Sequence, residues 1–160
     1  MRPLRASETI LEEVAAHARA SYPDECCGFL IAGPDLRDPS APRTLVASEP
    51  AENAFEGGRS TRFLLRPQEL RAADRRAEAG GRAVVGFYHS HPDRPARPSR
   101  LDQENAWPGY SYLVIHVDAA QATELRAFEL DPDSLEFRPV RLLADIGDGS
   151  VGAATPGEKV

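Results

Sequence analysis

The stretch Gly86-Phe-Tyr-His-Ser-His-Pro-Asp-Arg-Pro-Ala-Arg-Pro-Ser-Arg-Leu-Asp102 is the most informative part of the chain. It continues an apolar segment, residues 82–89, that is typical of a buried strand. His89 and His91 stand two residues apart at the end of that strand, and strand side chains alternate between faces, so both imidazoles are predicted to point to the same side. Pro92 is expected to stop the strand and leave both rings at its open end.

Two imidazoles at one strand end can share a metal ion, and Asp102 is a suitable third, oxygen ligand. Two histidines and one carboxylate leave the fourth position of a tetrahedral zinc site for water, as catalytic zinc sites require. Interpretations of these residues without a metal ion also remain open. A histidine at a strand end is often a hydrogen-bonded surface residue. Ser99-Arg-Leu-Asp102 also has the pattern of a helix capping box, which needs no metal. One hydroxyl is not expected to serve the cap and a catalytic role equally well.

Other reactive side chains are less informative alone. His17 and His116 lack ligand-like neighbours and are interpreted as structural, and Glu25 alone resembles an ordinary surface carboxylate. The adjacent Cys26 and Cys27 are poorly placed for an unstrained disulfide, and on a strand they face opposite ways. We interpret them as small buried hydrophobic residues.

Together, these residues resemble the signature of the JAMM (MPN-plus) metallopeptidases. The matching elements are Glu25, His89-Ser-His91, a gap of seven residues and Ser99-x-x-Asp102. Three surrounding segments also look like the family's strands: Glu25-Cys-Cys-Gly-Phe-Leu30, Val85-Gly-Phe-Tyr-His89 and Pro108-Gly-Tyr-Ser-Tyr-Leu-Val-Ile115. The resemblance extends from about Ile10 to Val140.

The resemblance implies one zinc ion per chain, held by His89, His91 and Asp102. It implies that Glu25 is the general base and that the Ser99 hydroxyl stabilises the oxyanion. Family members cut peptide or isopeptide bonds after the C-terminal tail of a ubiquitin-like protein. This compact chain looks most like prokaryotic members that act on sulfur-carrier proteins ending in Gly-Gly. The polar segment Glu49–Arg62 is the expected wall of a slot for that tail.

Two other functions remain open at this point. A non-catalytic MPN scaffold would bind protein partners without turnover, although such members usually lack some of the ligands. A different metal hydrolase would act on small amides or phosphoesters, but phosphoryl chemistry favours a second metal and more cationic groups than this stretch offers.

The remaining sequence predicts an α/β domain with a mixed β-sheet flanked by helices. The resemblance makes this a single MPN (cytidine-deaminase-like) domain over residues 1–143, with a flexible tail at 144–160. A helix capped by Ser7 and a second from Pro67 to Ala79 are expected, with a short helix from about Ser99. Strands are expected over residues 26–33, 43–48, 61–65, 82–89, 110–117, 124–130 and 135–142.

The charge and apolar content of the chain limit the kinds of partner that are expected. The 160 residues carry a net charge of −6 and no basic run, and Arg71, Arg75 and Arg76 alternate with acids on a solvated helix face, so nucleic acid is not an expected partner. No apolar stretch is long enough for a membrane span or a secretory signal, so a cytoplasmic location is expected. The oligomeric state, including a homodimer, stays open.

Overall fold

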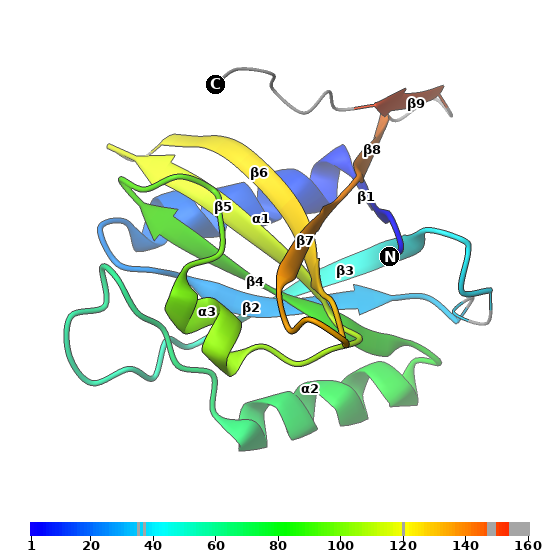
Figure 1. Cartoon of the computed structure of the whole chain (residues 1–160), viewed down its shortest axis with the longest axis horizontal. Coiled ribbons are helices and arrows are strands. Elements are labelled where there is room, and N and C mark those ends of the chain that lie inside the picture. The colour runs from blue at the N-terminus through cyan, green and yellow to red at the C-terminus, as the bar shows by residue number, and fades with distance from the viewer. Residues whose placement is uncertain (35, 37, 120, 147–149, 154–160) are drawn as a thin grey trace.

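The computed structural model describes residues 1–34, 36, 38–119, 121–146 and 150–153. These residues form a mixed sheet with helices against it (Figure 1). The helices are α1 (Glu8–Ser21), α2 (Pro67–Ala79) and α3 (Arg100–Asn105). The strands are β1 (Leu4–Ser7), β2 (Cys27–Ala32), β3 (Arg43–Ala51), β4 (Ala83–Pro92), β5 (Ser111–Asp118), β6 (Gln121–Leu130), β7 (Phe137–Val140), β8 (Leu142–Ile146) and β9 (Ser150–Ala153).

The strand order is β7-β6-β5-β4-β2-β3-β1-β8-β9. Strand β4, which carries the two histidines, lies inside the sheet between antiparallel β2 and parallel β5. The parallel pairs β4–β5, β1–β3 and β1–β8 make the sheet mixed, as predicted.

The two longer helices cover opposite faces of the sheet (Figure 1). Helix α1 buries one apolar stripe against side chains that include Leu30 and Leu113. That stripe consists of Ile10, Val14 and Ala18. Helix α2 buries Ala73 and Ala77 in a second cluster on the other face. Each face therefore has its own core, and β4 is buried between them.

A register shift in β4 decides which face receives the histidines. Leu30 pairs with Gly86 but the next residue, Ile31, pairs with Val84, so β4 has one extra residue at this point. After the shift, Phe87 belongs to the α2 cluster and Tyr88 to the α1 cluster. The alternation beyond Phe87 places the histidines on the α2 face and Ser90 on the α1 face.

Several predicted boundaries were wrong. Residues 61–65 are not a strand, because the amide of Leu64 donates to the Asn53 side chain and its carbonyl accepts from Ala54 instead of from a neighbouring strand. Strand β4 includes Pro92, which still pairs with Val117 of β5.

The C-terminal part also differs from expectation. The predicted strand at 135–142 is two strands, β7 and β8, separated at Arg141. Strand β8 crosses the predicted domain boundary at residue 143, because it pairs with β1, a strand too short to be predicted from its sequence. Residues 147–149 and 154–160 of the predicted tail lie outside the described residues. Within the described ranges, no helix has the length and apolar character needed to cross a membrane.

Candidate metal centre and active site

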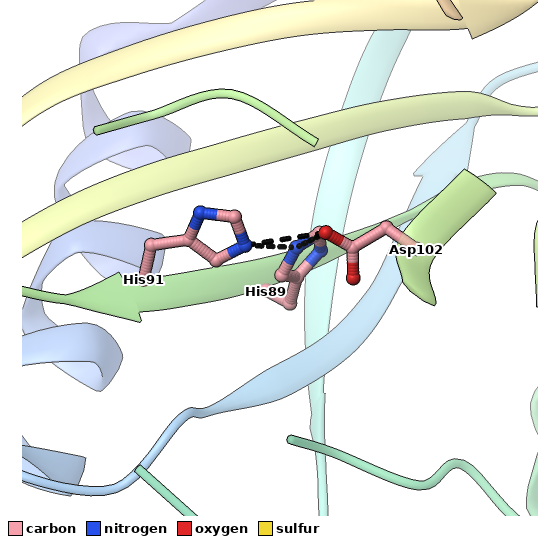
Figure 2. Close-up of side chains that lie close together, drawn as sticks. All are labelled: His89, His91 and Asp102. Atoms are coloured by element: carbon pink, nitrogen blue, oxygen red, sulfur yellow. Dashed lines mark hydrogen bonds and ion pairs between the residues drawn. The ribbon is translucent and has the colours of Figure 1, made fainter. Parts of the chain in front are cut away.

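His89, His91 and Asp102 converge on one point (Figure 2). The Nε2 atoms of the two histidines are 3.0 Å apart. The Asp102 Oδ2 atom lies 3.4 Å from Nε2 of His89 and 3.3 Å from Nε2 of His91. The histidines come from the end of β4 and the aspartate from α3, so two separate elements meet here. Both histidines are only 2% exposed.

These distances fit a shared metal ion. Zinc–nitrogen bonds of about 2.0–2.1 Å place neighbouring ligand atoms of a tetrahedral site about 3.3 Å apart. The carbonyl of Pro95 lies 3.0 Å from Nδ1 of His91 and can only accept, so Nδ1 carries a hydrogen and Nε2 is the ring atom available to a metal ion. Nε2 of His91 then faces an imidazole nitrogen and a carboxylate oxygen, and such a group of buried donor atoms is stabilised by a cation.

The His89 ring is held by packing more than by hydrogen bonds. Its Nδ1 atom is buried and has no hydrogen-bond partner in the described part of the chain. Phe63 stacks on the ring, with centroids 4.7 Å apart and an angle of 24° between the planes. Burial lowers the pKa of His89, which favours the neutral ring that binds metals. The role of Phe63 was not predicted from the sequence, because residues 61–65 have the pattern of a strand.

The capping box predicted at α3 is present and orients Asp102. The Ser99 Oγ atom accepts from the amide of Asp102 at 3.1 Å, and Asp102 Oδ2 accepts from the amide of Ser99 at 2.5 Å. The cap uses a lone pair of the Ser99 oxygen and leaves its hydrogen free to donate. The conflict expected between the two roles of Ser99 is therefore weaker than predicted.

Asp102 is strongly biased toward the carboxylate form. Burial would raise the pKa of Asp102, but the two histidine rings and the Ser99 group outweigh burial and hold the pKa below its ordinary value. An ionised oxygen donor beside two imidazole nitrogens is the ligand chemistry that a divalent ion such as zinc prefers.

Glu25 lies two positions before the first residue of β2 and is only 3% exposed. The neighbouring residue Cys26 is hydrogen-bonded to β4. Its amide donates to Ser90 Oγ at 2.8 Å, and the Ser90 amide donates to the Cys26 carbonyl at 3.1 Å. Cys27 pairs with His89, and Glu25 is two positions before Cys27, so the alternation turns Glu25 to the face of the histidines. The middle serine of His-Ser-His thus anchors the strand start that carries Glu25.

A partly buried ion pair holds the Glu25 carboxylate. Its partner is Nη2 of Arg94, from the segment between β4 and α3. Burial raises the pKa of Glu25 to about 7, although the nearby His91 and Arg94 oppose the rise. A carboxylate with a pKa near neutrality is suited to accept and return protons. The role of Arg94 was not predicted from the sequence, because an arginine among prolines carries no recognisable pattern.

The segment after β3 forms hydrogen bonds with both the main-chain amide and the main-chain carbonyl of Glu25. The Glu25 amide donates to the Arg59 carbonyl at 2.7 Å. Asn53 Nδ2 donates to the Glu25 carbonyl and to the Arg62 carbonyl, each at 3.0 Å. Asn53 Oδ1 accepts from the amides of Phe55 and Leu64, each at 3.1 Å. One side chain therefore organises the segment that packs beside the site.

The remaining histidines and the cysteines lie outside the three-ligand cluster formed by His89, His91 and Asp102. Nδ1 of His17 is 2.8 Å from the Tyr88 hydroxyl, and Nδ1 of His116 is 2.6 Å from the Arg94 carbonyl. Cys26 and Cys27 are both buried and free. Burial raises the pKa of both thiols, which makes them poor nucleophiles.

Comparisons with known proteins agree with the predicted resemblance. The chain is 36% identical over 114 residues to desampylase from Haloferax volcanii, a match that covers 71% of this chain and 77% of that protein. It is 30% identical over 135 residues to CysO-cysteine peptidase from Mycobacterium tuberculosis, covering 84% of this chain and 87% of that protein. A solved JAB1/MPN domain protein from Archaeoglobus fulgidus is 15% identical and covers 89% of this chain and 97% of its own, with a TM-score of 0.51.

That structural likeness confirms the predicted MPN fold. Residues 7–131 match the family model described as prokaryotic homologues of the JAB domain. The chain therefore belongs to the family of prokaryotic JAB-domain proteins.

Proposed function

We propose that this protein is a zinc-dependent hydrolase that cleaves the peptide or isopeptide bond after the C-terminal Gly-Gly of a ubiquitin-like sulfur-carrier protein. The observation that carries the proposal is the convergence of His89, His91 and Asp102 beside a buried carboxylate, Glu25. A relative named as a CysO-cysteine peptidase supports a peptidase reaction.

His89, His91 and Asp102 would hold the zinc ion. When bound, zinc acts as a Lewis acid that polarises a carbonyl and makes water more acidic. The two buried imidazoles and the carboxylate would supply two nitrogen donors and one oxygen donor, which would leave a coordination position open.

Glu25 moves the proton. It accepts a proton from the attacking water, and the water oxygen adds to the carbonyl carbon of the terminal glycine. As the carbon–nitrogen bond breaks, Glu25 returns the proton to the leaving amine, so one water is consumed and two products form. The raised pKa of Glu25 suits both directions of transfer.

Ser99 stabilises the charge that develops during this step. Its oxygen already caps α3, and its free hydrogen is available to the carbonyl oxygen that becomes negative. Because the cap fixes the Ser99 side chain at the start of α3, the donor is oriented before the substrate arrives.

The segment from Asn53 to Phe63 forms one side of the proposed slot for the Gly-Gly tail. It binds the Glu25 backbone through Asn53 and Arg59, and it covers His89 with Phe63. Glycines suit a narrow approach to these groups, because they lack side chains. The two free cysteines fit a reducing compartment, and we propose the cytoplasm as the location.

The direct test is cleavage of a sulfur-carrier protein extended beyond its Gly-Gly, followed by mass spectrometry of the products. We expect release of the extension by zinc-loaded protein and no release by the Glu25→Gln variant. Cleavage of a panel of small amides at comparable efficiency, with the carrier intact, would contradict the proposal.

A further inference from the structure

Arg94 is fixed beside Glu25 by its main chain. The Arg94 carbonyl accepts from Nδ1 of His116 at 2.6 Å. The preceding residue, Asp93, has a positive φ of 55°, donates its amide to the Val117 carbonyl at 2.8 Å and accepts from the Tyr22 hydroxyl at 2.9 Å. These contacts give a structural role to a histidine and a tyrosine that the three-ligand cluster does not use.

The guanidinium of Arg94 has unused hydrogen-bond donors. Only Nη2 contacts Glu25, while Nε is buried and has no partner among the described residues. The side chain is 34% exposed, against 2% for Glu25, so part of the arginine is accessible to solvent while the carboxylate is buried. Asp93, the acidic residue next to it in sequence, is hydrogen-bonded to Tyr22 instead. The structure thus presents a cation that can bind another anion beside Glu25.

The position of this cation relates it to the leaving group. Glu25 must come within hydrogen-bond reach of the leaving amine in order to protonate it. When the leaving group is a single amino acid, its α-carboxylate is separated from that amine by one carbon atom. When the leaving group is a protein joined through lysine, the amine is at the end of a four-methylene chain and carries no nearby carboxylate. A guanidinium in contact with Glu25 therefore distinguishes these two classes of substrate.

We propose that Arg94 binds the α-carboxylate of a single amino acid joined to the terminal glycine of the carrier, so that the enzyme favours release of a free amino acid over release of a lysine-linked protein. This inference rests on the proposed function and specifies its substrate. Arginine is suited to the task, because its planar fork binds carboxylates through two parallel hydrogen bonds.

Three probes built on one sulfur-carrier protein test the proposal. The first has one cysteine after Gly-Gly with a free carboxylate, the second has the same cysteine as its carboxamide, and the third is linked to the ε-amine of a lysine in a folded protein. For the wild type we expect kcat/KM for the free acid to exceed that for the carboxamide by about 10- to 100-fold, the range of a charge-assisted hydrogen-bonded pair. The lysine-linked probe should be cleaved no faster than the carboxamide.

The variant Arg94→Gln should reduce the free-acid preference to about 1, mainly through KM, and Arg94→Lys should restore part of it. Because the preference is a ratio within one variant, a general loss of activity or folding does not change it. Arg100→Gln is the matched control, since its side chain is 93% exposed and pairs with Glu104.

Equal rates for free acid and carboxamide in the wild type, or an unchanged ratio in Arg94→Gln, would overturn the role of Arg94 while leaving the proposed function intact. If no probe is cleaved by zinc-loaded protein, the proposed function fails and this inference fails with it.

Discussion

The side-chain nitrogen of Asn53 lies 3.0 Å from the main-chain oxygen of Glu25 and links the segment after β3 to the proposed general base. This contact predicts an activity loss from a residue that is neither a metal ligand nor a base. Asn53→Ala removes four hydrogen bonds, at about 0.5–1.5 kcal/mol each, from a partly exposed segment. We expect hydrogen exchange at the Leu64 amide to accelerate and kcat/KM to fall, with zinc retained.

Asn53→Asp separates the two halves of this arrangement. The aspartate keeps an acceptor for the amides of Phe55 and Leu64 but loses the donor to Glu25. Protection of Leu64 should therefore survive in this variant while activity falls. If both Asn53 variants cleave at the wild-type rate, the segment has no positioning role.

Glu25→Gln is predicted to retain zinc, because Glu25 lies outside the three-ligand cluster. Its amide cannot accept and return a proton, and loss of general acid–base catalysis typically costs about 100- to 10,000-fold in rate. Zinc content by elemental analysis and single-turnover cleavage check both parts. A normal rate in this variant would show that another group is the base.

Ser99 is predicted to contribute to both catalysis and the stability of α3. Ser99→Ala removes the donor to the oxyanion and should lower kcat by about 100- to 1,000-fold. It also removes the cap of α3, which costs about 0.5–2 kcal/mol in the free energy of unfolding. Ser99→Thr is the control, because it keeps a hydroxyl for both roles. If Ser99→Ala loses stability but keeps its kcat, Ser99 caps the helix and has no role in catalysis.

Gly28 is predicted to tolerate no side chain. A β-carbon at this position would lie 2.4 Å from the Tyr88 ring and 2.5 Å from the Glu49 carbonyl, and the latter is backbone of the neighbouring strand. Gly28→Ala should lower the free energy of unfolding by about 1–3 kcal/mol, the usual cost of overpacking a core. Gly58→Ala is the matched control, since nothing lies within 4 Å of its added carbon. Similar denaturation midpoints for the two variants would contradict this assignment of strain.

The sequence predicted the convergence of the histidines because strand alternation depends on spacing alone, and His89 and His91 are two residues apart. It could not predict which face they occupy, because that depends on the extra residue that β4 has opposite β2. The predicted helix from Pro67 to Ala79 is confirmed, since a proline at its first position and glycines after its end are local signals.

Contacts between segments that are distant in the chain could not be predicted from the sequence. The pairing of Arg94 with Glu25 joins residues 69 positions apart. The stacking of Phe63 on His89 depends on the course of a segment whose hydrogen bonds go to Asn53 and not to a strand. Strand β1 is four residues long and is recognisable only from its pairing with β3 and β8.

The central claim is that His89, His91 and Asp102 hold one metal ion. Elemental analysis of the purified chain, with Asp102→Ala and His91→Ala beside it and His116→Ala as a control outside the cluster, tests this most directly. We predict about one zinc per chain in the wild type and in His116→Ala, and almost none in the two ligand variants, because two remaining ligands hold zinc weakly. Zinc retained at full stoichiometry by Asp102→Ala or His91→Ala, with both variants folded by circular dichroism, would contradict the account.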